Sequence, residues 1–157
     1  MIIDGIAPVF EVNNVGANEI YTSIQSGTKV IKLIADEPIS ITGTLEAKHF
    51  DVWVGASAET LGDADKVTLS AVALDATDVT GKTLLLTLPN EITNAQKVEL
   101  TYTPDSTGYI VDAYGNEMAA ITSRVNVHEI ADAALPKVKS MSIDFADYSA
   151  LAGGTNG

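Results

Sequence analysis

Residues 84–102, LLLTLPNEITNAQKVELTY, decide the fold class, because two alternating runs flank one polar break. In the second run Val98, Leu100 and Tyr102 share one face, while glutamate and threonine lie on the other. In the first run every second residue from Leu84 is likewise a leucine. A period of two is typical of a strand with one buried face. The stretch therefore predicts two strands separated by a turn at Pro89.

The same period recurs along most of the chain. Alternating runs at 19–24, 29–35, 50–54, 66–74, 121–127 and 141–145 are separated by turn residues such as Gly and Asn. Short strands separated by such turns predict an all-β fold, an immunoglobulin-like antiparallel β-sandwich of about seven to nine strands. The segments 90–96 and 147–153 lack an apolar stripe, so we interpret them as turns or single helical loops.

The two ends of the chain differ from its middle in their hydrophobic pattern. We expect an N-terminal arm over residues 1–8, the sandwich over 9–127, and a C-terminal extension over 128–157. The extension is predicted to hold one strand at 137–145, after Pro136, and then a glycine-rich tail. Terminal segments that do not pack on their own domain often pack on a neighbour.

Composition excludes several classes of function. The 157 residues include 9 basic and 21 acidic side chains, which give a net charge of -12, and 46% of residues are hydrophobic. A field of this sign repels phosphate backbones and anionic lipids, so we expect neither nucleic acid nor membrane partners. The chain has no cysteine, which excludes disulfides, thiolate zinc sites and cysteine nucleophiles. Neither a signal peptide nor a transmembrane helix is predicted.

One loop carries the best candidates for a metal site. Asp112, Asn116 and Glu117, with Asp105, offer the oxygen ligands that calcium prefers. An EF-hand spacing is absent, however, and turn chemistry explains the same residues. Asp112 can cap a turn through its carboxylate, while Gly115 and Asn116 readily adopt a positive φ. We therefore predict a hairpin loop here and expect no cofactor.

Two further patterns have plain structural explanations. The Gly-Lys-Thr at 81–83 resembles the end of a phosphate-binding loop, but Ala76 stands where glycine is needed and a strand follows. His49 and His128 lack the spacing of a zinc site, so each is predicted to lie at the surface or at a strand edge.

Acid pairs also have a simpler explanation than catalysis. Asp36 with Glu37, or Asp144 with Asp147, could be proposed as the two carboxylates of a glycosidase. Among 21 acidic residues such pairs arise by chance, and we interpret them as part of a solvated acidic face.

Three aromatic residues are candidates for an intermolecular surface. Because Phe50 and its alternate neighbours are predicted to face the core, Trp53 should point outward, where a large apolar ring needs a cover. Trp53 then marks an interface, or else a shifted register beside a bulge puts it in the core. Phe145 and Tyr148 of the C-terminal extension are candidates for the same kind of intermolecular surface.

Three segments in order resemble a known family. VIKLIADEPIS (30–40), KTLLLTLPNEITNAQKVELTYTP (82–104) and IVDAYGNEMAAI (110–121) are similar to the immunoglobulin-like repeats of large bacterial surface proteins. These include the cyanobacterial swimming-motility and S-layer types, and the resemblance covers roughly residues 30–127. It implies a β-sandwich with a scaffolding or adhesive role, and it carries no catalytic residues.

Together these patterns predict a structural protein that is not an enzyme. The first expectation is a bacteriophage virion component, such as a capsid decoration, cement or fibre protein. Its arms would bind the capsid or neighbouring subunits in an oligomeric assembly. The alternative is an immunoglobulin-like module of a bacterial adhesin or S-layer protein at the cell surface.

Overall fold

The computed structural model describes residues 3–11, 19–25, 27–93 and 95–131. Within them the chain is all-β, with antiparallel strand pairs predominating, so the predicted fold class is confirmed. No helix in these ranges is long and apolar enough to cross a membrane. The strands are β1 (Glu19–Gln25), β2 (Thr28–Ile34), β3 (Ser40–Gly43), β4 (Phe50–Ala56), β5 (Lys66–Val67), β6 (Ala71–Leu74), β7 (Thr83–Ile92), β8 (Gln96–Tyr102), β9 (Gly108–Val111) and β10 (Ile121–Ala131).

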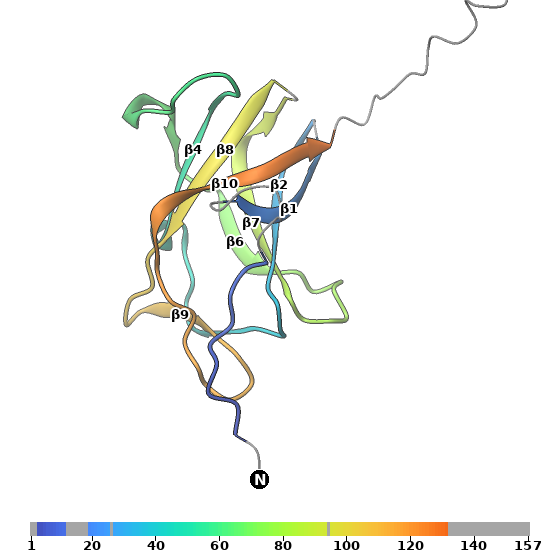
Figure 1. Ribbon diagram of the computed structural model, residues 1–157, viewed down its shortest axis with the longest axis vertical. Coiled ribbons are helices and arrows are strands. Elements are labelled where there is room, and N and C mark those ends of the chain that lie inside the picture. The colour runs from blue at the N-terminus through green and yellow to red at the C-terminus, as the bar shows by residue number, and fades with distance from the viewer. Residues whose placement is uncertain (1–2, 12–18, 26, 94, 132–157) are drawn as a thin grey trace, which may run out of the picture.

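Two layers form because β1 joins two groups of strands. The order β5-β4-β8-β10-β1-β2-β7-β6 places β1 between β10 and β2, and the sheet folds over at this point (Figure 1). Side chains from both groups then meet in one buried cluster, which includes Leu33 and Leu86 from one and Val52 and Leu100 from the other. The inward positions predicted on β7 and β8 are all buried.

The pairing of the first and last strands differs from the expected antiparallel arrangement. β1 runs parallel to β10, with Glu19 opposite Asn126 and Ile20 opposite Val127. A period of two is the same for parallel and antiparallel neighbours, so the pattern could not distinguish them. β10 continues to Ala131, beyond residue 127. The strand predicted at 137–145 lies outside the described residues, as do Phe145 and Tyr148.

The predicted strand at 66–74 is two strands in the structure. Val67 pairs with Val52 in one layer, whereas Val72 pairs with Leu86 in the other. Leu69 lies buried between the two pieces. The chain crosses between layers here, and the local alternation continues through the crossing, which is why it predicted one strand.

A small second sheet closes one end of the sandwich. β3 pairs with β9, near the N-terminal segment (Figure 1). Gly108 permits the close approach, because a Cβ there would overlap the carbonyl oxygen of Thr44. The sheet is tied to the core by Tyr102, whose hydroxyl oxygen accepts a hydrogen bond from the Ile110 N–H at 3.0 Å. Burial raises the pKa of Tyr102, so this hydroxyl keeps its proton at neutral pH.

Candidate functional site

The loop between β9 and β10 is built around Asp112. Its Oδ1 accepts hydrogen bonds from the N–H groups of Tyr114 at 2.7 Å and Asn116 at 2.8 Å. Gly115 takes a φ of 89°, which only glycine adopts without strain. The sequence-based assignment of this stretch as a hairpin turn capped by Asp112 agrees with this geometry.

Asn116 holds the N-terminal segment against this loop. Its Nδ2 donates to the carbonyl oxygen of Asp4 at 3.0 Å, to that of Ile6 at 3.3 Å, and to Oδ2 of Asp112 at 2.6 Å. Asp4 in turn accepts the Ile6 N–H on Oδ1 at 2.9 Å. The bonds from one amide group therefore place Asp4 beside Asp112, although the two are far apart in sequence.

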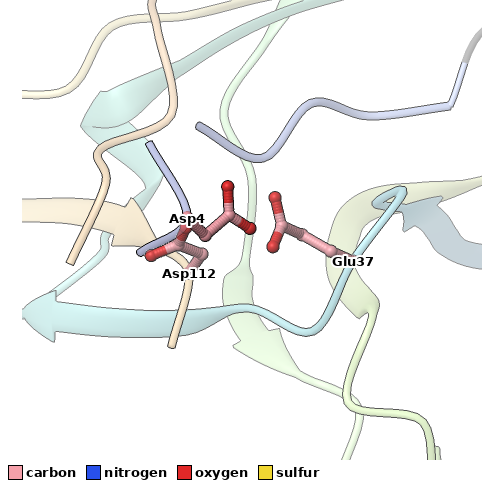
Figure 2. A group of neighbouring side chains, drawn as sticks. All are labelled: Asp4, Glu37 and Asp112. Carbon is pink, nitrogen blue, oxygen red and sulfur yellow. The ribbon is translucent and has the colours of Figure 1, made fainter. Parts of the chain in front are cut away.

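Glu37 completes a group of three carboxylates with Asp4 and Asp112 (Figure 2). One oxygen from each lies within 4.8 Å of the others; Asp112 is buried and the other two are half-buried. Partial burial, together with the charges of Asp4, Asp112 and Asp36, raises the pKa of Glu37. Three carboxylate oxygens at this spacing match the ligands that hard cations prefer, so these residues can hold such an ion.

The calcium candidates from the sequence are only partly brought together. Asp112 belongs to the group of three, and Asn116 lies beside it but presents its Nδ2 donor to Asp4. Glu117 is exposed and outside the group, and Asp105 lies in the β8–β9 loop, where it binds His49.

The pKa of Asp112 is lowered in the structure. Burial alone would raise this pKa, but the hydrogen bonds from Asn116 and from the loop N–H groups outweigh it. Asp4 and Glu37 were not among the sequence candidates for a metal, since no local spacing links them to Asp112. Calcium binding stays untested.

His49 is buried, which corrects the prediction of a surface or strand-edge position. Only 1% of it is exposed, in the 3₁₀ turn before β4. Its Nδ1 accepts the Glu46 N–H at 2.9 Å, so Nε2 carries the proton and donates to Asp105 Oδ1 at 3.2 Å. With both ring nitrogens engaged in the fold, His49 acts as a structural residue joining two loops. The side chain of His128 is outside the described part.

The loop at 75–83 is a hairpin between β6 and β7, as predicted. Asp75 accepts the Thr77 N–H at 2.9 Å, and Asp78 accepts the Thr80 N–H at the same distance. Asp78 also accepts the Lys82 N–H at 3.0 Å. Hydrogen bonds from the Thr77 hydroxyl to Asp75 and from the Thr80 and Thr83 hydroxyls to Asp78, together with the backbone N–H bonds, lower the pKa values of both carboxyls. The carboxylates thus organise the turn at the position where a phosphate-binding loop would present free amides.

Of the two alternatives left open for Trp53, the structure shows the unshifted register on β4 without a bulge, yet it also shows the ring buried. Its register with Glu99 on β8 is continuous with that of its neighbours. The ring is nevertheless only 6% exposed, because the Arg124 guanidinium stacks over it, 3.8 Å from the ring centroid. Arg124 also donates to the carbonyl oxygen of Leu61 at 2.7 Å. A role for Trp53 at an interface stays a prediction, and it would require Arg124 to move.

A comparison with solved structures finds a match for this fold. The crystal structure of the S-layer protein rSbsC(31-844) superposes with a TM-score of 0.53 and 16% sequence identity. The match covers 84% of this chain but only 14% of that chain. No protein-family model matches, and no curated protein matches by sequence. Identity this low shows a shared β fold alone, and the immunoglobulin-like type stays a prediction.

Proposed function

We propose that this chain is a non-enzymatic structural module of a bacterial surface layer, the alternative that the sequence suggested. The observation that carries the proposal is the likeness to one module-sized portion of an S-layer protein. The three sequence segments that resemble surface-protein repeats lie on β2 and the loop after it, on the β7–β8 hairpin, and on the end of β9 with the β9–β10 loop. The resemblance of the sequence segments and the likeness of the fold both support this proposal.

The loops support a scaffold role. Asp75, Asp78, Asp105 and Asp112 each accept the N–H of the residue two positions on. A carboxylate used in this way stiffens a turn, because it replaces water as the partner of the backbone donor. Stiff loops at the ends of a sandwich suit a module whose task is to hold its neighbours at fixed positions.

A virion component is the second candidate, and the exposed apolar side chains of the N-terminal segment fit it. Ile3 and Ile6 are each 72% exposed, and Val9 is half exposed. Apolar side chains displayed along a terminal segment fit an arm that docks on a neighbouring subunit. The same arm would serve a surface layer.

Immunogold labelling of thin sections and of purified phage tests these proposals together. Antibodies against the purified chain are expected to label the cell envelope of the producing bacterium. Label on phage particles instead would favour the virion component. Label confined to the cell interior would contradict both.

A further inference from the structure

An apolar groove runs between the N-terminal segment and the start of β10. Its volume is about 210 Å³. Phe10 and Met118 form its buried part, while Ala119 and Ala120 are exposed at its mouth. The complete lining is Val9, Phe10, Met118, Ala119, Ala120, Ile121 and Val125. Among the described residues, β1 pairs with β10 only from Asn126 onward, and the groove lies beside the part of β10 that precedes this pairing.

Acidic side chains adjoin one end of this groove, because the same two segments supply both. Asp4 precedes Val9 on the N-terminal segment, and Asp112 precedes Met118 on the β9–β10 loop. Asp36 is bound to Val9, donating its N–H to the Val9 carbonyl oxygen and accepting the Val9 N–H on Oδ1. With Glu37 these acids make an electronegative end next to an apolar one. Lys82 donates to the Asp36 carbonyl oxygen and offsets part of this charge.

One segment of this chain has a complementary pattern. In residues 137–145, KVKSMSIDF, the odd positions of an extended strand carry Lys137, Lys139, Met141, Ile143 and Phe145 on one face. Two cations are therefore followed by three large apolar side chains. The groove side has the same order along the chain, because Asp112 precedes the apolar lining residues at 118–121 and 125.

The place where β10 ends, at Ala131, favours the groove of a second copy over the groove of the same copy. β10 leads from the groove at Ile121 to Ala131, at the end of the sandwich away from the N-terminal segment (Figure 1). A direct return along β10 would meet β1, which occupies that edge from Asn126 to Ala131. β8 occupies the other edge. A copy stacked head to tail presents its groove at the end from which the segment departs.

We propose that residues 137–145 of one copy occupy the apolar groove of a second copy, with Lys137 and Lys139 against its acidic end. The inference rests on the proposed function, since it names another copy as the partner of the structural module. The contact joins two different surfaces, so it is heterologous and generates closed rings or open rows of subunits. Burial of the three apolar side chains favours association, and the two lysines set the register.

Sedimentation velocity of the full chain with two variants tests the proposal. Ala120→Arg blocks the groove at an exposed position, and Ile143→Asp places a charge on the apolar face of the segment. The unchanged chain is expected to form concentration-dependent oligomers, and each variant alone should associate at least about tenfold more weakly. Ala73→Arg, at an exposed site on β6, is the matched control and should associate normally.

A mixture of the two variants gives the decisive outcome. Ala120→Arg keeps an intact segment and Ile143→Asp keeps an intact groove, so together they should form one-to-one pairs and nothing larger. A monomer at all concentrations would overturn the proposal, and so would association that persists in both variants. The outcome is independent of cellular location, so it can fail while the envelope labelling succeeds, or the reverse.

Discussion

Tyr102→Phe removes one oxygen atom from the centre of the molecule and tests how the small β3–β9 sheet is held. Tyr102 and Ile110 are both fully buried, and the lost atom accepts the Ile110 N–H at 3.0 Å. The phenylalanine ring can keep the stacked contact with Phe50, whose centroid lies 5.0 Å away. The change therefore leaves a buried donor without its partner while largely preserving the packing.

An unpaired buried N–H costs about 1–3 kcal/mol. For a chain of this length, that corresponds to a fall in Tm of about 2–4 °C for each kcal/mol. Urea unfolding followed by the fluorescence of Trp53 should show a lower midpoint with an unchanged slope. Amide exchange at Ile110 should accelerate in the same variant.

Tyr114→Phe is the matched control, since Tyr114 is 64% exposed on the β9–β10 loop. Its free energy of unfolding should stay within about 0.5 kcal/mol of the unchanged protein. If Tyr102→Phe is as stable as this control, the hydroxyl does not anchor β9 and the reasoning is refuted.

Three other substitutions probe separate parts of the structure. Folding raises the pKa of Glu37 above its ordinary 4.5, so the free energy of unfolding falls as pH rises from 4.5 through the pKa of the folded state. Glu37→Gln should therefore raise the Tm at pH 7 in a thermal scan. Gly108→Ala drives a methyl group into the Thr44 carbonyl and should cost about 1–3 kcal/mol in urea unfolding. Arg124→Ala uncovers the single tryptophan, so Trp53 emission should shift to the red, with a loss of about 0.5–2 kcal/mol.

Each of these changes has a control in the chain. Glu91→Gln removes the same charge from an exposed site outside the acid group, and an equal gain in Tm would mean that only net charge matters. Gly62→Ala meets no atom within 4 Å, so a loss as large as that of Gly108→Ala would contradict the close approach. Lys66→Ala removes an ammonium group that lies 5.7 Å from the centroid of the Trp53 ring, and it should shift the emission less than Arg124→Ala.

Local alternation predicted most of the sandwich because it reports which face of a strand is buried. Leu84, Leu86 and Leu88 all face the core for this reason. It could not predict that β1 lies parallel to β10, since both pairings give the same period. Local alternation also missed β3 and β9, which have four residues each. These strands are held by the close approach at Gly108 and by the Tyr102 hydroxyl, and neither feature produces an alternating pattern.

The acid group was harder to predict than the fold. Asp112 was assigned correctly to a turn, because the residues that bond to it are its neighbours in sequence. Asp4 joins it because Asn116 binds the N-terminal segment, a contact between residues at opposite ends of the domain, and Glu37 comes from the separate loop after β2. The sequence left the burial of Trp53 open and did not predict its cause, since the cover comes from Arg124 on another strand.

The claim that this module works by joining copies of itself can be tested by a single disulfide. The chain has no cysteine, so Ala120→Cys and Ile143→Cys can be made separately and mixed under oxidised glutathione. Non-reducing electrophoresis should show a dimer linked from groove to C-terminal segment, and Ala73→Cys in place of Ala120→Cys should form little of it. Equal yields from the two mixtures would contradict the account.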